Sequence, residues 1–140
     1  GITGLVKVVT LTDNDVNVAA TDAIVYYSVS AGAIDLDSAT ASSNVLVLSD
    51  TLSTALDEAL EASGAYAMTT GDDGNGFIAE DGILVLWSDG TDTKLSVAET
   101  DTTKDNQAIA DTNLTIHDIA IFKGITDADN IVAGNFDAVL

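Results

Sequence analysis

GILVLWSDGTDTKLSVA, residues 82–98, is the clearest structural signal in this chain. The apolar run Ile83 to Trp87 is followed by the polar turn Ser88-Asp89-Gly90-Thr91, and a second strand-like run extends from Lys94 to Ala98. Glycine adopts positive φ at little steric cost, so an Asp-Gly pair between two such runs is typical of a β-hairpin. The sequence therefore predicts two antiparallel strands joined at Asp89 and Gly90.

The same kind of pattern extends over most of the 140 residues. Val, Ile and Thr are abundant, and short apolar runs are bounded by Asp, Asn, Gly, Ser and Thr, which is typical of β-strands. Further strands are predicted at residues 5–11, 23–29, 45–48 and 114–122. Proline is absent and no linker-like tract divides the chain. We therefore expect a single acidic, mainly β domain over residues 1–140, either β-sandwich-like or α+β.

Two segments depart from the strand pattern. Apolar residues recur at three- and four-residue spacing at Leu52, Ala55, Leu56, Ala59 and Leu60. This spacing predicts one amphipathic helix at about 51–63, with Asp50 or Thr51 capping its start and Gly64 ending it. A short C-terminal helix is predicted from Asp127 to Ala133.

The charge balance is strongly acidic. The chain has 23 Asp and Glu against four Lys and a formal charge of -19, yet 46% of its residues are hydrophobic and its mean hydropathy is +0.28. These values exclude a disordered acidic tail and indicate a folded core with carboxylates around it, where salt or calcium reduces their mutual repulsion. The lysines are scattered singly, so no nucleic-acid partner is expected. No apolar run approaches the roughly 20 residues of a membrane-spanning helix, so no membrane insertion is expected.

The densest group of oxygen ligands is GDDGNGFIAEDG, residues 71–82. Calcium takes six to eight oxygen ligands, and closely spaced carboxylates with glycines that allow tight curvature suit it. Calcium is therefore the predicted cofactor, and the candidate ligands are Asp72, Asp73, Asn75, Glu80 and Asp81. The alternative is a solvated acidic turn before a strand, because the EF-hand pattern would place Gly71 and Gly82 where acids are required.

Patterns that carry catalysis are not found in the sequence. His117 is the only histidine and cysteine is absent, so a zinc site lacks donors, and His117 is expected to be a partly exposed strand residue. There is no Gly-x-Ser-x-Gly motif, and in so acidic a chain a pair of carboxylates does not indicate glycoside chemistry. The few aromatic residues, Trp87 among them, are expected to pack in the core. We therefore expect that the protein is not an enzyme.

From residue 52 onward the sequence resembles the C-terminal, non-repeat region of large acidic bacterial exoproteins of the RTX type, which are secreted by type I systems. The features that carry the resemblance are the helix with Ala55 and Leu56, the turn at 74–78, the hairpin at 84–95, and the segments 121–128 and 135–140. Gly-Gly-x-Gly-x-Asp repeats are absent, so the parallel β-roll of these proteins is not implied. The resemblance implies a surface-layer, adhesin or matrix protein, extracellular or at the cell surface. No N-terminal leader is visible, so we expect export to be directed from elsewhere or the leader to have been removed.

The function expected from these observations is that of a secreted structural subunit that self-assembles into an extracellular filament, sheath or surface layer, assisted by calcium. Its partner would be the chain itself, as a homo-oligomer or polymer. The N-terminal strand shows little alternation of apolar and polar residues and is predicted to pair with a neighbouring copy through Ile2, Leu5, Val6, Val8 and Val9. The alternative is a monomeric, calcium-stabilised adhesin-like binding domain or type I secretion end domain.

Overall fold

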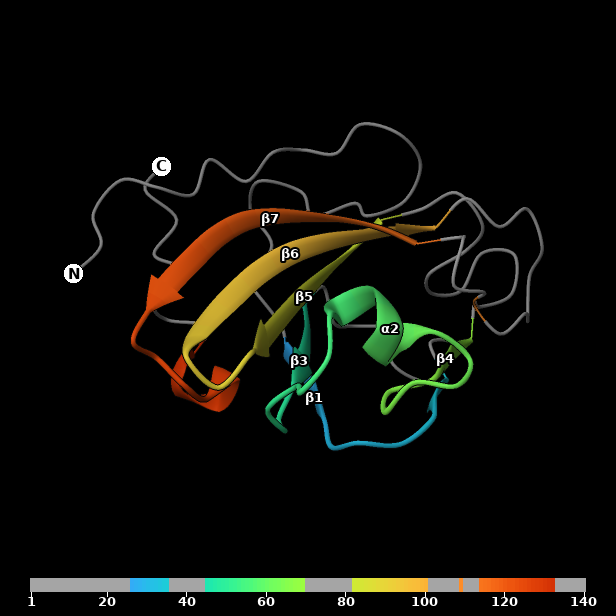
Figure 1. Cartoon of the computed structure of the whole chain (residues 1–140), viewed down its shortest axis with the longest axis horizontal. Coiled ribbons are helices and arrows are strands. Elements are labelled where there is room, and N and C mark those ends of the chain that lie inside the picture. Colours follow the sequence, from blue (N-terminus) through green and yellow to red (C-terminus); the bar gives the residue numbers. More distant parts are fainter. Residues whose placement is uncertain (1–25, 36–44, 70–81, 101–108, 110–113, 133–140) are drawn as a thin grey trace.

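The computed structural model describes residues 26–35, 45–69, 82–100, 109 and 114–132, and a five-stranded mixed sheet dominates this part of the chain (Figure 1). In spatial order the strands are β1 (Tyr26–Val29), β3 (Val45–Leu48), β5 (Gly82–Ser88), β6 (Asp92–Thr100) and β7 (Leu114–Lys123). A second sheet consists of two short parallel strands, β2 (Ile34–Asp35) and β4 (Met68–Thr69). The prediction of a mainly β fold is confirmed.

One half of the large sheet is parallel. β1 pairs with β3 and β3 pairs with β5 in parallel, and the chain crosses from β3 to β5 through the helix α2 (Leu56–Leu60). All four residues of β3 are buried, as expected for a strand that is covered on both faces. This burial explains why the sequence of β3 is a continuous apolar run without alternation.

The other half is antiparallel and contains the predicted hairpin, which is confirmed. β5 pairs with β6 so that Trp87 lies opposite Lys94, and Gly90 in the turn has a φ of 83°. The carboxylate of Asp89 accepts the backbone N–H groups of Thr91 and Asp92, each at 2.9 Å. These hydrogen bonds lower the pKa of Asp89 to about 2, and the bond from the N–H of Asp92 has the largest effect.

The helix α2 begins later than the spacing of apolar residues predicts. The carboxylate of Asp50 accepts the backbone N–H of Ala31 at 2.8 Å, and the N–H of Leu52 donates to the carbonyl of Ser88 at 2.8 Å. The segment before α2 is thus bonded to other parts of the fold, and Asp50 does not cap the helix. The helix starts at Leu56 after an N-cap residue without a side-chain hydrogen bond.

The helix α2 also ends earlier than predicted, because the chain turns back on it. Its C-cap is Glu61, and the N–H of Tyr66 returns to the carbonyl of Ala59 at 2.8 Å. Gly64 lies in this turn, where a Cβ atom would lie 2.3 Å from the carbonyl oxygens of both Glu58 and Ala59. Gly64 is therefore required by close backbone approach, three residues after the C-cap.

The predicted C-terminal helix is present as a single 3-10 turn, η2 (Ala128–Asn130). Asp127 caps it, because its carboxylate accepts the N–H of Asp129 at 2.9 Å. Ala128 and Ile131 are buried, whereas residue 131 is already extended. The turn is therefore shorter than the predicted helix and fixes two apolar side chains against the sheet.

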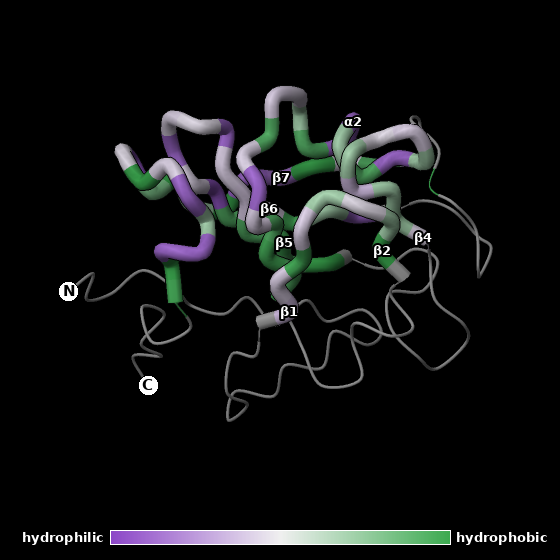
Figure 2. The backbone as a smooth tube through the Cα atoms, turned by 90° about the horizontal axis from the view of Figure 1, so that it is seen from below, coloured by the Kyte–Doolittle hydropathy of each residue, from purple (hydrophilic) through white to green (hydrophobic). Residues whose placement is uncertain are grey.

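Two apolar clusters cover the faces of the sheet. The first includes Leu46, Val85 and Trp87 of the strands and Leu56 of α2. The second includes Val45, Val47, Leu86 and Leu95 of the strands, with Ala128 and Ile131 at η2. Neighbouring residues of one strand belong to different clusters, because successive side chains point to opposite faces. Figure 2 shows hydrophobic residues along the central strand β5.

A β-bulge allows strand β7 to contribute to both clusters. Its partly buried apolar residues are Leu114 and Ile116 on the α2 side, and Ala120 and Phe122 on the η2 side. The bulge lies where Ser96 pairs with Asp118 but Leu95 pairs with Ala120, so Ile119 is the extra residue. One extra residue reverses the alternation of side chains, so even-numbered residues face one cluster before the bulge and the other after it.

Candidate functional site

The site residues predicted from the sequence lie outside the described part of the chain. This holds for the calcium ligands Asp72, Asp73, Asn75, Glu80 and Asp81, and for the assembly residues Ile2, Leu5, Val6, Val8 and Val9. Among the residues that the structure describes, no group of three or more His, Cys, Asp or Glu side chains is arranged to hold a metal ion. The described residues instead bring together a different candidate site, on strand β7.

Strand β7 lies at the edge of the large sheet. All of its ten residues except Ile119 pair with β6, and no other described strand lies beside it (Figure 1). Ile119 is 53% exposed and Ile121 is 47% exposed. The third large apolar residue that is exposed in the described ranges is Val132, at 55%. A long edge strand with exposed apolar side chains is a template on which another strand can be added.

Strand β7 is also electrically neutral. Asp118 and Lys123 are its only formal charges when His117 is neutral, whereas the whole chain carries -19. His117 is exposed, as predicted, and its Nε2 atom lies 3.8 Å from Oε2 of Glu99. A second protein chain that approaches β7 therefore meets much less local repulsion than the overall charge suggests.

The two lysines among the described residues differ in how far they reach into solvent. Lys94 is enclosed, with its side chain 21% exposed, its ammonium 3.2 Å from Oδ2 of Asp89 and 4.6 Å from the ring centre of Trp87. Lys123 lies 2.7 Å from Oδ2 of Asp92, yet its side chain is 77% exposed. The hydrogen bond to Asp92 raises the pKa of Lys123, which keeps it charged. An ammonium group has three N–H donors, so Lys123 can hold a second carboxylate as well.

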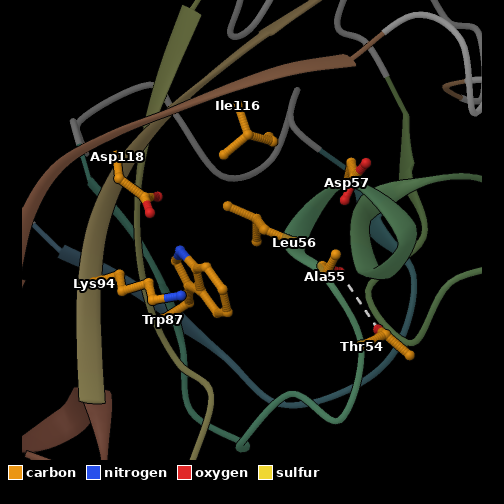
Figure 3. Close-up of a pocket in the computed structure, with 8 residues that line it drawn as sticks. All are labelled: Thr54, Ala55, Leu56, Asp57, Trp87, Lys94, Ile116 and Asp118. Atoms are coloured by element: carbon orange, nitrogen blue, oxygen red, sulfur yellow. Dashed lines mark hydrogen bonds between the residues drawn. The ribbon is translucent and has the colours of Figure 1, made fainter.

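A groove of about 430 Å³ opens between α2 and β7 (Figure 3). Its lining residues are Thr54, Ala55, Leu56, Asp57, Trp87, Lys94, Ile116 and Asp118. Figure 3 shows Leu56 and Ile116 pointing toward one another above the indole of Trp87, with the ammonium of Lys94 beside that ring. The groove thus has an apolar centre and charged residues around it, and it adjoins the edge strand.

A chain of hydrogen bonds connects the core to the edge of the sheet. Nε1 of Trp87 donates to Oγ of Ser96 at 2.9 Å, and the Ser96 hydroxyl donates to Oδ1 of Asp118 at 2.6 Å. Ser96 is fully buried and Trp87 is only 5% exposed, so Trp87 packs in the core as predicted. These two hydrogen bonds hold the exposed carboxylate of Asp118 in a defined position next to the bulge.

Sequence analysis missed the exposed residues of β7. The sequence Ile119-Ala120-Ile121-Phe122 is a run of four apolar residues without the alternation of a half-buried strand. That run was a usable signal, but it does not reveal whether the strand lies in the middle or at the edge of a sheet. The order of strands in a sheet depends on contacts between distant segments, which the local pattern does not specify.

Comparison of the chain with models of protein families, with curated proteins and with solved structures gives no significant match. Within the described ranges, no helix is both long enough and apolar enough to cross a membrane.

Proposed function

We propose that this chain is a structural subunit that associates with copies of itself through the β7 edge, in an extracellular filament, sheath or surface layer. The observation that carries the proposal is an edge strand of ten residues, without net charge, on which Ile119 and Ile121 are exposed. Adding a strand of another copy would bury these side chains and satisfy the backbone of the edge. The acidic remainder keeps the subunits dispersed until its charge is screened.

An extracellular location and assistance by calcium are parts of the same proposal. The resemblance to the flanking region of type I-secreted RTX exoproteins supports the location. The carboxylates and the amide at Asp72, Asp73, Asn75, Glu80 and Asp81 support calcium as the assisting ion. A bound cation lowers the repulsion between copies, and sodium chloride shares part of this effect by screening. In this role the protein is not an enzyme.

Light scattering coupled to size-exclusion chromatography tests the proposal at two salt concentrations. We expect monomers at about 0.01 M sodium chloride and dimers or larger species at about 1 M, because the Debye length falls from about 30 Å to about 3 Å. Ile119→Lys and Ile121→Lys should weaken association. Val132→Lys is the matched control, since it also replaces an exposed apolar residue but lies outside β7.

The alternative function predicts a different result in the same experiment. A monomeric adhesin-like or secretion end domain, stabilised by calcium, stays monomeric at both salt concentrations, with and without a chelator. Monomers under all of these conditions would therefore reject self-assembly.

A further inference from the structure

We infer that two copies of this chain pair antiparallel through β7 about a twofold axis, with Asp118 of each copy facing Lys123 of the other. The inference rests on the proposed function, because it names the surface and the geometry of the self-association. The juxtaposition that carries it is one acid and one base on the same face of the edge strand, five positions apart.

Asp118 and Lys123 project from the same face of the sheet. Asp118 pairs with Ser96 of β6, and Lys123 pairs with Asp92 of the same strand. Ser96 and Asp92 are separated by an even number of residues, so their side chains share one face. The bulge at Ile119 lies between the two charged residues and brings them to the same face although their spacing in β7 is odd.

The signs of these two charges select the direction of pairing. In an antiparallel pair with twofold symmetry, placing Asp118 opposite Lys123 of the second copy also places Lys123 opposite Asp118, so two ion pairs form. In a parallel pair in register, Asp118 would face Asp118 and Lys123 would face Lys123. Like charges directly opposite each other destabilise a sheet, so the parallel arrangement is disfavoured.

The groups that would form these ion pairs are exposed and have capacity for a further partner. The ammonium of Lys123 uses Oδ2 of Asp92 as one acceptor, at 2.7 Å, and has more N–H groups to donate. Asp118 accepts the Ser96 hydroxyl through Oδ1, and a carboxylate accepts several hydrogen bonds. The pairing therefore needs no rupture of the contacts within each copy.

The exposed isoleucines lie at the centre of this arrangement. With Asp118 opposite Lys123 and Ile119 left unpaired as the bulged residue, the twofold axis passes through the two copies of Ile121, which lie opposite each other. Ala120 of each copy then lies opposite Phe122 of the other. The interface then has an apolar centre with one ion pair at each end. A bulged edge disfavours addition of an arbitrary straight strand, whereas a second β7 offers complementary charges at matching positions.

Single-cysteine variants measure the direction of pairing, since the chain contains no cysteine. Ile121→Cys and Thr115→Cys form a matched pair, because both positions are exposed on β7. In the antiparallel arrangement the two copies of position 121 lie directly opposite each other, within the roughly 4.4–6.8 Å between Cα atoms that a disulfide spans. The two copies of position 115 lie roughly 33 Å apart, at about 3.3 Å per residue. Treatment with diamide in about 1 M sodium chloride should therefore cross-link Ile121→Cys and leave Thr115→Cys monomeric on non-reducing gels.

Three other outcomes overturn the inference in distinguishable ways. Equal cross-linking at positions 115 and 121 indicates parallel pairing in register. Association in light scattering under reducing conditions, without cross-linking of Ile121→Cys, places the interface elsewhere and leaves self-assembly standing. Monomers under every condition reject the proposed function itself and this inference with it.

Charge reversal tests the ion pairs separately from the overall charge. Asp118→Lys and Asp57→Lys change the net charge by the same amount, and both positions line the groove. Asp57→Lys should leave the dimer unchanged or strengthen it, because the subunit becomes less acidic. Asp118→Lys should instead raise the dimer Kd by about tenfold or more, because the new ammonium group would face the ammonium group of Lys123 in the second copy and repel it. If both variants strengthen association equally, Asp118 does not pair with Lys123. Circular dichroism of both variants is the control for folding.

Discussion

The carboxylate of Asp92 lies 2.7 Å from the ammonium of Lys123 and accepts the backbone N–H of Gly124 at 2.8 Å. These contacts join the first residue of β6 to the last residue of β7 and to the turn that follows. Nearby, the Ser88 hydroxyl donates to the carbonyl of Thr126 at 2.8 Å. The closed end of the β5–β6 hairpin is thus fastened to the segment that leads to η2.

Acid should weaken this end of the sheet between about pH 4 and pH 2. The pKa of Asp89 is lowered to about 2, and that of Asp92 is lowered chiefly by its hydrogen bond from Lys123. A carboxyl group with a lowered pKa stabilises the folded chain above its unfolded value of about 3.9, and this contribution is lost as the pH falls through the folded value. The Tm of Asp89→Asn should therefore depend less on pH in this window than the Tm of the wild type.

Thermal unfolding followed by circular dichroism measures this difference. Glu58→Gln, an exposed change on α2, is the control and should keep the wild-type slope. Identical slopes in the wild type and Asp89→Asn would contradict the prediction.

Ser96→Ala should destabilise the chain by about 1–3 kcal/mol, because it leaves the buried indole N–H of Trp87 without its acceptor. Urea unfolding measures the free energy. A double-mutant cycle with Trp87→Phe should show a coupling of about 0.5–3 kcal/mol. Strict additivity of the two changes would mean that the hydrogen bond does not stabilise the fold.

Gly64→Ala should destabilise the chain more than Gly124→Ala. At Gly64 the new methyl group meets two carbonyl oxygens at 2.3 Å, so the backbone itself has to move. Gly124 has a φ of 73° with open space around it, and the change there costs only the strain of a left-handed residue, about 1–2 kcal/mol. Tm values of the two variants give the ranking, and a larger loss at Gly124 would refute it.

Leu56→Ala should cost about 2–5 kcal/mol, because this buried side chain of α2 packs into the first apolar cluster and its removal leaves a cavity. Glu58→Ala on the exposed side of the same helix should change the free energy of unfolding by about 0.5 kcal/mol or less. Urea unfolding of both variants measures the contrast. Similar values would mean that α2 does not seal the core.

Calcium should raise the Tm beyond the effect of ionic strength alone. The comparison is between calcium chloride and sodium chloride at matched ionic strength, since both screen the charge of -19. Asp73→Asn combined with Asp81→Asn should abolish the excess effect of calcium, as expected if these carboxylates are ligands. Equal Tm values of the wild type in the two salts would reject a calcium site.

The hairpin was predictable because its determinants are local. Asp89 and Gly90 specify the turn through their own hydrogen bonds and φ value, and the apolar runs on both sides supply the strands. The length of α2 was not predictable, because Asp50 and Leu52 are bonded to segments far away in sequence. The spacing of apolar residues indicates which face of a helix is buried. It does not indicate whether the residues at the start of the helix form hydrogen bonds with distant segments instead.

The local sequence pattern did not predict the order of the strands or the candidate site, for a related reason. All four residues of β3 are buried, so its sequence lacks the alternation that assigns a face or a neighbour. In the sequence, Asp118 is distinguished only by following His117, the single histidine. Its position on an edge strand, five residues before an exposed lysine on the same face, depends on the bulge and on the pairing with β6.

The bulge gives β7 one residue more than its pairing with β6 requires. Removing Ile119 would place Ala120 directly after Asp118, and the pairs Ser96–Asp118 and Leu95–Ala120 would then follow each other without interruption. Phe122 would stay in its cluster and Lys123 would stay opposite Asp92. This point of the strand should therefore tolerate the loss of one residue, because the residue that is lost has no partner in β6.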